Sequence, residues 1–519
     1  MTSQPTVDAR ETHLSTLFFT PERVFKLLKP VSLPFVDFAS TERRCAAATH
    51  EFERNRAISP DVYLGLTDIE EDGELVDRMI IMRRLPADLE LEYLLARGAS
   101  DELLTSVARR VSTMHAGLPA LTGSGAEPAS LDAIAQNWED NFAAIQPVVG
   151  SVIEPAEFHR VAALARTFMA GRAPLFQQRI DDGWVRDGHG DLRAEHIYCL
   201  DQGPQLIDCV AFDDRLRISD SLADVAFLAM DLDRLAGPGA AVTFMRAWNE
   251  FTNENHPSSL AHFYVGYRAH VRCKIACLNH LGGDPDAAAA AQVYHQLAQR
   301  HLEHARVRLV LVGGGPGTGK STVAERVASE LGGVWIRSDE VRKDVAGVAH
   351  DAHAFAEPDE GLYSPAVSAK TFDELTRQTT ALLEHGMSVV LDATWRSETD
   401  RAALRQIADE SAARVTELQC VLPNAVAKER IIKRMASVYN PSDATPELVD
   451  YLAERFDTWP QATPIDTSQS VATTMQAVLR SLWAEVPGRE PVPMTPVRFS
   501  IDLTSLRNAV LIRGGIGDG

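Results

Sequence analysis

The sequence predicts a two-domain protein of the mixed α/β and α+β class, followed by a short C-terminal tail. Its 519 residues are too many for one ordinary hydrophobic core. From Val307 onward, apolar strand-like runs alternate with helix-like segments, as in a parallel sheet flanked by helices. Before Val307, short strand-like runs come first and long helical patterns follow, which is typical of an α+β domain.

The N-terminal domain is predicted from three stretches of pattern. Up to about Leu85 we expect short strands with one helix, "STERRCAAATHEFERNRAI", for which Ser40 is the predicted N-cap. Residues 87–180 and 220–304 have apolar residues three and four apart, as helices do. Between them lies a strand-and-loop segment that carries "HGDLRAEHI" at residues 189–197.

We expect the domain boundary near Ala305, where a long helical segment runs directly into the apolar strand "VRLVLV". A second break comes at the Pro-rich stretch "VPGREPVPMTP", after about Glu485. The tail beyond it has one strand-like piece, "NAVLI", and a glycine-rich end. The predicted regions are therefore residues 1–304, 305–485 and 486–519.

Composition narrows the class of protein. The formal net charge of −21 disfavours general affinity for nucleic acid or an anionic membrane, because both need a basic surface. We find no apolar run long enough to span a bilayer and no signal peptide at the start. The six cysteines do not form a disulfide framework, and Cys273 and Cys277 are expected in the core. These features predict a reduced, cytoplasmic protein.

The strongest chemical signal is "GGGPGTGKST" at residues 313–322, which fits G-x-x-x-x-G-K-[ST] from Gly314. An apolar strand leads into it and a helix follows, as a phosphate-binding loop (P-loop) requires. We expect Lys320 to reach the β- and γ-phosphates of a nucleotide and the Ser321 hydroxyl to ligate Mg²⁺. The predicted nucleotide-binding residues are Gly314, Gly315, Pro316, Gly317, Thr318, Gly319, Lys320, Ser321 and Thr322.

Three further charged residues accompany the P-loop. In "SVVLDATWR" an apolar strand ends at Asp392, where P-loop enzymes order the metal and its water, so Asp392 is a predicted metal residue. In "IRSDEVRKD" we expect Ser338 to cap a helix that places Asp339 and Arg342 on one face. The carboxylate could accept a proton from a substrate hydroxyl, and the guanidinium could hold the substrate. Equally, Ser followed by Asp-Glu is what any helix N-terminus prefers, so both interpretations stay open.

From Val307 to roughly Ser468 the chain resembles the P-loop kinases of small molecules and nucleic-acid ends. That group includes gluconate-kinase-like enzymes, polynucleotide 5′-kinases, chloramphenicol phosphotransferases and zeta-type toxins. The resemblance implies that Asp339 is the substrate base and Arg342 the substrate clamp, with Lys320 also catalytic.

The same resemblance extends to the end of the domain. It implies that two arginines of the lid segment "KERIIKRM", Arg430 and Arg434, lie near the nucleotide. "NPSDAT" at residues 440–445 resembles the substrate-proximal loop, and "IDTS" from Ile465 resembles the last strand. Arg401 stands where the family has a basic residue.

The stretch "HGDLRAEHI" resembles part of a second phosphoryl-transfer signature, H-x-D-x-x-x-x-N, with a catalytic Asp and a metal-binding Asn. Asp191 is then the catalytic residue, and Asp208 in "QLIDCVAFDD" is the metal-binding carboxylate, close enough in sequence for a hairpin between them. "RISDSLADVAFLAMDL" resembles the Asp-bearing helix of aminoglycoside-phosphotransferase-like proteins. We expect Asp220 and Asp224, at its start, to be structural.

This second resemblance covers roughly residues 12–300 and implies a protein-kinase-like domain of two lobes. It implies that Lys26 binds phosphate, with Lys29 as the competing choice, and that Glu51 is the ion-pair partner of that lysine. "IIMRRLP" would be the hinge. The two halves together resemble a family of bacterial two-domain phosphotransferase-like ATP-binding proteins.

Position 196 departs from the signature, because it holds His in place of Asn. An amide oxygen suits Mg²⁺, whereas an imidazole suits transition metals better. His196 could ligate Mn²⁺, or bond Asp191 and hold it in place, or mark a site that binds nucleotide and transfers poorly. We favour the metal role, because position 196 is the ligand position of the motif. The small lobe also lacks a G-x-G-x-x-G loop.

These expectations describe an ATP-dependent phosphotransferase that acts on a hydroxyl of a small molecule, with the P-loop domain as the better-supported active site. ATP and Mg²⁺ are the expected cofactors, with Mn²⁺ as an option at the N-terminal site. The alternatives are a regulator, in which a degenerate kinase-like half controls a P-loop ATPase, and a polynucleotide 5′-hydroxyl kinase. We expect neither nucleic acid nor membrane as a partner, and no motif indicates the substrate or the oligomeric state.

Overall fold

The computed structural model describes residues 8–12, 14–33, 36–350, 360–435, 446–483 and 503–513. The chain forms two compact units. Unit 1 contains Met1–His159, Phe176–Glu254 and Tyr264–His301, and unit 2 contains Arg160–Leu175, Asn255–Phe263 and Leu302–Gly519. The division into residues 1–304, 305–485 and 486–519 stays a prediction.

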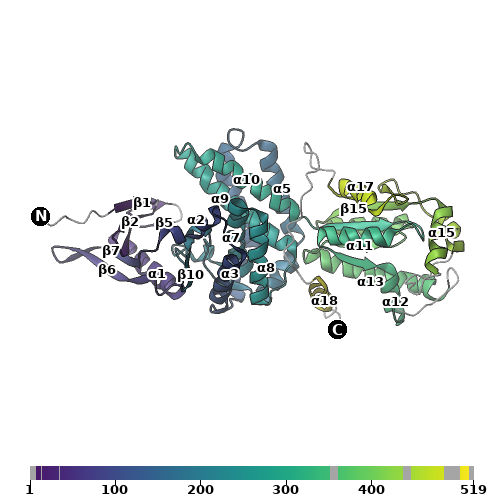
Figure 1. Ribbon diagram of the computed structural model, residues 1–519, viewed down its shortest axis with the longest axis horizontal. Helices are drawn as coiled ribbons and strands as arrows, with labels where there is room; N and C mark the ends of the chain where they lie inside the picture. The colour runs from purple at the N-terminus through teal and green to yellow at the C-terminus, as the bar shows by residue number, and fades with distance from the viewer. Residues whose placement is uncertain are drawn as a thin grey trace. The chain divides into compact units, whose positions relative to one another are not determined.

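Unit 1 begins with a five-stranded antiparallel sheet (Figure 1). Its strands, in the order β1-β2-β3-β7-β6, are β1 (Asp8–Glu11), β2 (Ser15–Phe19), β3 (Arg23–Leu28), β7 (Glu74–Arg83) and β6 (Tyr63–Glu71). Two short strands, β4 (Ser32–Leu33) and β5 (Val36–Asp37), pair with each other. Helix α1 (Thr41–Ile58) packs on β7 and β6, and its N-cap is Ser40, as predicted. The core between helix and sheet contains Val24, Ala48 and Ile80.

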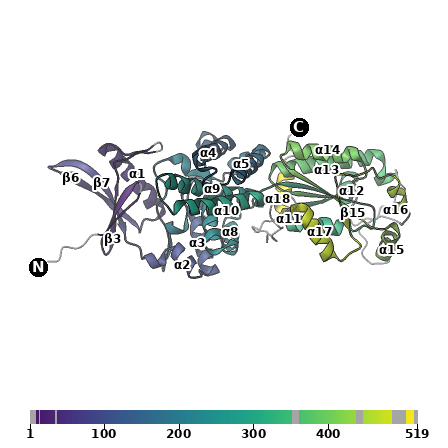
Figure 2. The same ribbon diagram turned by 90° about the horizontal axis from the view of Figure 1, so that it is seen from above.

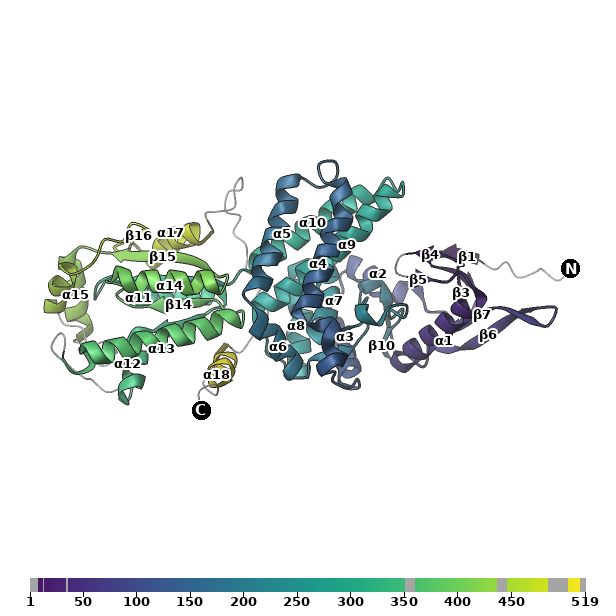
Figure 3. The ribbon, with the colours of Figure 1, turned by 180° about the vertical axis from the view of Figure 1, so that it is seen from behind.

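Helices make up most of the remainder of unit 1. The boundary between the units passes through four of them, α5, α6, α9 and α10, so that each has some residues in unit 1 and some in unit 2. They are α2 (Leu91–Ala96), α3 (Asp101–Ala116), α4 (Leu131–Ile145), α5 (Pro155–Ala170), α6 (Ala173–Asp181), α7 (Ser221–Ala236), α8 (Pro238–Thr252), α9 (Ser258–Leu281) and α10 (Ala287–His304). Short 3₁₀ turns are η1 (Ala87–Leu89), η2 (Gly123–Ala129), η3 (Gln146–Val148), η4 (Ala194–His196) and η5 (Asp214–Leu216). Helix α7 packs against α8 and α2 (Figure 3). Every residue from Ser221 to Asp233 is buried.

The loops of interest in unit 1 lie between short strands. Strands β9 (Ile197–Leu200) and β10 (Gly203–Leu206) form the predicted antiparallel hairpin, and β8 (Val185–Asp187) pairs with β11 (Ile218–Asp220). The "HGDLRAEHI" segment therefore connects β8 to β9, and α7 starts directly after β11. With the strand order of the first sheet, this is the kinase-like succession of elements that the sequence predicts.

Unit 2 is built around a parallel five-stranded sheet in the order β13-β14-β12-β15-β16. These strands are β13 (Val334–Arg337), β14 (Val389–Asp392), β12 (Arg308–Gly313), β15 (Arg414–Val421) and β16 (Thr463–Asp466). The helices are α11 (Lys320–Leu331), α12 (Ser338–Ala346), α13 (Pro365–Glu384), α14 (Glu398–Glu410), α15 (Asn424–Met435), α16 (Pro446–Ala453) and α17 (Val471–Trp483), with η6 (Gly361–Tyr363) before α13. Helices α11 and α17 cover one face of the sheet and α13 and α14 the other (Figure 2). The predicted parallel sheet flanked by helices is confirmed.

Two local predictions are wrong. "NAVLI" is not a strand but part of helix α18 (Leu503–Arg513), which packs against α13 with Val510 buried. A short apolar run does not distinguish a strand from a buried helix by itself. Ser338 does not cap α12 but is its first helical residue, and Arg337 takes the N-cap position without a side-chain hydrogen bond. Such one-residue differences are common at helix ends.

None of the helices in the described ranges combines the length and the apolar character that a bilayer crossing requires.

The buried ion pair at the start of α7 yields a stability prediction. Asp220 accepts bonds from Nε (2.7 Å) and Nη2 (2.8 Å) of Arg179 and from the backbone N–H of Leu222 (2.9 Å). Asp220→Ala should lower the free energy of unfolding by about 3–5 kcal/mol, because it removes a helix cap and half of a buried ion pair. Calorimetric unfolding measures the change.

The matched control is Glu11→Ala. Glu11 pairs with Lys29 at 2.8 Å, but its side chain is 74% exposed, so solvent screens the pair. Equal shifts of the unfolding transition in the two variants would contradict a structural role for Asp220.

Candidate functional site

The P-loop of unit 2 joins β12 to α11 as a tight turn around glycines. Gly314 has a φ of 137°, and a Cβ there would lie 2.6 Å from the carbonyl oxygen of Cys420 on β15. Gly317 has a φ of 77°, and its Cβ would lie 2.6 Å from the carbonyl oxygen of Ala427 on α15. The backbone conformation and the close neighbours both require glycine at these two positions. The strand–loop–helix arrangement is the one that the motif predicts.

Lys320, Ser321 and Asp392 meet beside this loop. Asp392 ends β14, in register with Val312 on the neighbouring strand, and its side chain hydrogen-bonds the Ser321 hydroxyl. Burial raises the pKa of Asp392, and the charge of Lys320 and the Ser321 bond only partly oppose it. A hydroxyl and a carboxylate are hard oxygen donors, so this pair fits Mg²⁺.

No cluster of three or more His, Cys, Asp or Glu side chains in the described part of the chain is arranged to hold a metal ion. A pair of protein ligands is nevertheless what Mg²⁺ commonly has in nucleotide sites, since phosphate oxygens and water complete its shell. The residues present at Ser321 and Asp392 are therefore consistent with that ion.

The structure separates the two residues predicted to act on the substrate. Asp339 is exposed at the start of α12, near enough to raise the pKa of Asp392. Arg342 instead donates from Nη1 to the Leu362 carbonyl and to Ser368 Oγ, both at 3.2 Å, and stacks on Tyr363. The ion pair that forms across this first turn joins Arg337 to Glu340, at 2.7 Å. Asp339 is thus near the P-loop site, while Arg342 holds the segment that precedes α13.

The lid arginines differ in what the structure describes. Arg430 donates from Nη2 to the Thr467 carbonyl (2.9 Å), and its Nη1 would lie 3.6 Å from a Cβ on Gly319, so it lies over the P-loop. Arg434 belongs to α15, but its side chain and residues 440–445 lie outside the described residues. Arg401 is fully buried and donates to the carbonyls of Trp395 (2.6 Å) and Thr458 (2.7 Å), so it supports the fold.

A second charged group occupies unit 1, where Lys26 of β3 contacts Glu51 of α1 (2.6 Å) and Asp208 (2.8 Å). Burial would lower the pKa of Lys26, but the two carboxylates outweigh it and raise that pKa well above its ordinary value. Lys29 pairs instead with Glu11 (2.8 Å) at an exposed position. The structure therefore favours Lys26 over Lys29 and brings it to the predicted partner.

Asp208 adopts an unusual backbone conformation. Its φ of 60° lies in the left-handed region, which is uncommon for residues other than glycine, and its N–H donates to the Tyr63 hydroxyl (3.0 Å). Burial would raise the pKa of Asp208, but Lys26 and then His196 outweigh it and hold the pKa far below its ordinary value. Locally costly backbone that is held in place by neighbours is typical of functional sites.

His196 lies between Asp191 and Asp208. Its Nδ1 is 2.8 Å from the Asp191 carbonyl oxygen, so this nitrogen carries the proton and donates. The other ring nitrogen, Nε2, is 3.6 Å from Asp208 Oδ2 and 3.4 Å from Arg193 Nη2. The bond to Asp191 fits the holding role predicted for His196, and the lone pair of Nε2 beside Asp208 fits the metal role. The geometry is compatible with both.

Asp224 fixes the loop that carries this histidine and Asp191. Its carboxylate accepts the backbone N–H groups of His189 (2.8 Å) and Gly190 (2.9 Å), and it contacts His115 Nε2 (3.1 Å). Burial would raise the pKa of Asp224, but the His115 contact outweighs it and holds the pKa far below its ordinary value. With Asp220 capping α7, both of these aspartates are structural, as predicted.

Sequence reasoning missed Arg193. It donates from Nε to Asp191 Oδ1 (2.8 Å) and from Nη2 to Asp191 Oδ2 (2.9 Å), and it also contacts Glu195. Burial would raise the pKa of Asp191, but Arg193, followed by His196, outweighs it, so the pKa lies below its ordinary value. The one available signal is that Arg193 follows Asp191 by two residues in an irregular loop, and no periodicity marks such a pair.

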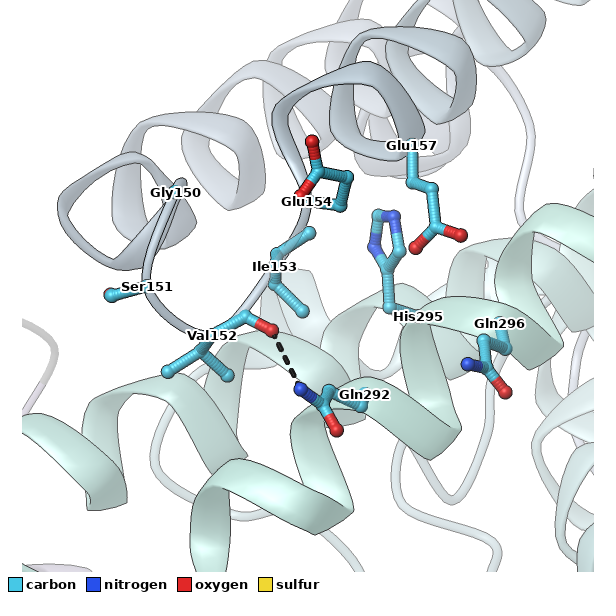
Figure 4. A pocket seen from close by; sticks show the side chains of 9 residues that line it. All are labelled: Gly150, Ser151, Val152, Ile153, Glu154, Glu157, Gln292, His295 and Gln296. Carbon is cyan, nitrogen blue, oxygen red and sulfur yellow. Dashed lines mark hydrogen bonds between the residues drawn. The ribbon is translucent and has the colours of Figure 1, made fainter.

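A cavity of about 300 Å³ lies away from these groups (Figure 4). Gln292 donates to the Val152 carbonyl at its rim (3.0 Å), and His295 and Glu157 line it. None of the residues that line it was predicted as a site residue.

Comparison with known families identifies the second half of the chain. A family model described as an AAA domain (AAA_33) matches residues 309–459, which include the P-loop and the Asp392 strand. The region is thus similar to P-loop domains, in agreement with its strand order and its glycine-rich loop.

Similar proteins cover nearly the whole chain. "Uncharacterized protein Rv2004c" of Mycobacterium tuberculosis (strain ATCC 25618 / H37Rv) is 34% identical over 470 residues, which are 90% of this chain and 94% of that protein. "Uncharacterized protein Mb2027c" of Mycobacterium bovis gives the same values. Both matches extend across the two halves.

Two solved structures resemble separate parts of the chain. A choline/ethanolamine kinase family protein from Mesorhizobium loti has a TM-score of 0.37 and 14% identity, over 57% of this chain and 88% of that one. A gluconokinase from Sinorhizobium meliloti has a TM-score of 0.26 and 17% identity, over 34% of this chain and 92% of that one. The fold of each half is assigned here from its own strand order and contacts.

The two aspartates of the N-terminal site should respond differently to substitution. In a Lys320→Ala background, Asp208→Ala should weaken binding of a metal-bound nucleotide, because it removes the carboxylate beside Lys26 and His196. Asp191→Asn should leave that binding intact and abolish transfer, because the amide cannot accept the substrate proton. Calorimetric titration with ATP and Mg²⁺ or Mn²⁺ measures the binding.

Asp68→Ala, which removes an exposed partner of Arg78, is the control for loss of a carboxylate in unit 1. If Asp208→Ala binds as tightly as this control, the carboxylate has no role in nucleotide binding.

The position of His196 predicts a change in metal preference. His196→Asn should move the preferred metal from Mn²⁺ toward Mg²⁺, because a hard amide oxygen replaces a softer imidazole nitrogen. His50→Asn, at a half-exposed histidine 3.7 Å from Asp214, is the control. Activity or nucleotide binding is measured with Mg²⁺ and with Mn²⁺ for wild type and each variant. If the dependence on the two metals is identical in wild type and His196→Asn, His196 does not ligate the metal and only its role of holding Asp191 remains.

Proposed function

The chain belongs to the family of the mycobacterial protein Rv2004c, and from that premise we propose that it is an ATP-dependent phosphotransferase acting on a hydroxyl of a small molecule. The observation that carries this proposal is the meeting of Lys320, Ser321 and Asp392 at a P-loop of required glycines. Nucleic acid and membranes are not proposed as partners, because the net charge of −21 opposes both.

In the proposed reaction the terminal P–O bond of ATP breaks and a new P–O bond forms to the substrate oxygen. ADP leaves with the electron pair of the broken bond, and the hydroxyl proton passes to a carboxylate. Mg²⁺, when bound with ATP, would neutralise charge on the phosphates.

The residues of unit 2 have separate roles in this scheme. Lys320 holds the β- and γ-phosphates through its charge, and the N–H groups of the glycine-rich turn bind their oxygens. Asp339 is the base, since it is an exposed carboxylate beside the site and has no ion pair in the described part of the chain. Arg430, over Gly319, balances charge on the nucleotide. The clamp role of Arg342 would require it to leave Leu362 and Ser368.

Unit 1 is proposed as a second phosphotransferase site. Lys26, held by Glu51, would bind phosphate, and Asp208 with His196 would face the metal ion. Asp191 would accept the proton of the substrate hydroxyl. Its two carboxylate oxygens already accept from Arg193, so Arg193 must move or share its bonds when substrate arrives.

The two hydrogen bonds from Arg193 to Asp191 also favour the second candidate, a regulator. In it, unit 1 binds nucleotide without transferring phosphate and controls the P-loop site. A base whose two oxygens are both bonded to a guanidinium is a poor proton acceptor. The two candidates differ in whether unit 1 alone turns over ATP in the full chain.

Full-length protein with Asp208→Ala, incubated with γ-labelled ATP and a metabolite extract, tests the P-loop site. Adding Lys320→Ala should abolish the remaining transfer, because the charge at the β- and γ-phosphates is lost. Lys370→Ala, at an exposed lysine of α13, is the control and should transfer as its parent does. Persistent turnover in the Asp208→Ala, Lys320→Ala double variant would remove both sites from the mechanism.

A further inference from the structure

Two arginines approach one aromatic ring in unit 1, that of Tyr294. Tyr294 of α10 is 8% exposed. The guanidinium carbon of Arg234, from α7, lies 5.4 Å from the centre of its ring, and that of Arg272, from α9, lies 5.8 Å from it. Three helices, of which α9 and α10 are consecutive in the chain, thus bring two cations to one ring, although like charges repel.

Arg272 is the exceptional member of this group. Its Nε is buried without a hydrogen-bond partner, and its side chain has no ion pair in the part of the chain that the structure describes. Its charge instead acts on the carboxylate of Asp191. A guanidinium atom that is shielded from water and unpaired is costly in the free protein, and an anion would relieve that cost.

The nearby carboxylates are already engaged. Asp191 and Glu195 both bond Arg193. Asp231 contacts Arg234 at 3.2 Å and accepts the backbone N–H of Ala194 at 3.2 Å. Glu92 approaches Arg234 only to 3.9 Å. Arg272 is therefore the guanidinium left to meet a ligand.

The group lies on the acceptor side of the site. Lys26 and His196 are the charges that act most on Asp208, which belongs to the proposed nucleotide side. Arg272 acts on Asp191, the proposed base, which must touch the molecule that receives the phosphoryl group. Tyr294 contributes to raising the pKa of Arg193, and Asp231, the partner of Arg234, accepts the backbone N–H of Ala194, so the group lies near the loop that carries Asp191.

We propose that Arg272, with Arg234 and Tyr294 around it, binds an anionic group of the acceptor substrate, so that the molecule phosphorylated by unit 1 carries a phosphate or carboxylate besides its hydroxyl. The planar guanidinium matches both groups, which can accept two parallel N–H bonds. Tyr294 supplies an apolar face for the body of the substrate. This inference rests on the phosphotransferase function proposed for unit 1.

The test measures binding, so that it does not depend on transfer. The full chain with Lys320→Ala, which disables the competing P-loop phosphate site, is titrated calorimetrically with four related sugars. They are glucose 6-phosphate, glucuronate, glucose and glucosamine, which offer a phosphate, a carboxylate, no charge and a positive charge. We expect at least one of the two anions to bind about tenfold or more tightly than glucose, with glucosamine weakest, and the stronger of the two names the group.

Substitutions then locate the effect. Arg272→Met keeps length for packing on Tyr294 and removes the charge, so it should weaken binding of that anion by roughly tenfold to a hundredfold and leave glucose unchanged. Arg272→Lys should keep part of the affinity, because the positive charge remains while the two parallel N–H donors of the guanidinium are lost. Arg43→Met, at an arginine whose side chain is 60% exposed and paired with Asp37, is the matched control.

The outcomes separate the two proposals. Glucose or glucosamine binding as well as the anions, Arg272→Met binding anions as wild type does, or no binding of either anion would overturn the inference. Phosphoryl transfer from labelled ATP is then measured on the same proteins. Anion binding that depends on Arg272 without any transfer would sustain Arg272 as an anion site and refute the enzymatic function on which its acceptor role rests, whereas transfer that Arg272→Met does not change would sustain that function and refute the inference.

Discussion

The pair of bonds from Asp224 to the backbone N–H groups of His189 and Gly190 determines the geometry of the N-terminal site. These bonds hold a loop whose only regular element is the short 3₁₀ turn η4. From that loop project Asp191, Arg193 and His196, which all lie in the short span before β9. A buried, ionised carboxylate is stable there only because backbone and histidine donors satisfy it.

The two candidate sites of this chain differ in the groups that could balance the charge of an anionic ligand. The P-loop offers backbone N–H groups with few charged side chains, and its conformation depends on Gly314 and Gly317. The site in unit 1 relies on side-chain charges instead, with Lys26 between two carboxylates and Asp191 against Arg193. Backbone donors keep their strength without a counter-charge, whereas the side-chain site is internally paired and must exchange partners when a ligand binds.

The sequence predicted those parts of the molecule that local chemistry determines. The P-loop, the end of β14 at Asp392, the cap at Ser40 and the hairpin before Asp208 each depend on neighbouring residues, and each was predicted correctly. The partnership of Lys26 with Glu51 came from family resemblance, because the two residues are on different elements. The contact between Arg272 and Tyr294 was not predictable, because α9 and α10 meet through tertiary packing that no pattern of residue spacing in the sequence indicates. The strand predicted for "NAVLI" was wrong for a related reason, because the conformation of this segment depends on the helix it packs against.

Helix α7 links the stability of unit 1 to its chemistry. Residues Ser221 to Asp233 are all buried, and the same helix has Asp220 as its N-cap and supplies Asp224 in its first turn and Asp231 toward its other end. A change on any face of α7 therefore disturbs either the core or the loop with Asp191. Divergence within this family should accordingly be slow in α7 and faster at the exposed positions of α9 and α10, such as Leu278 and Val293, where a side chain can change without loss of the core. Sequence changes tolerated in unit 1 would therefore collect at its surface, while the buried helix that holds the Asp191 loop stays the same.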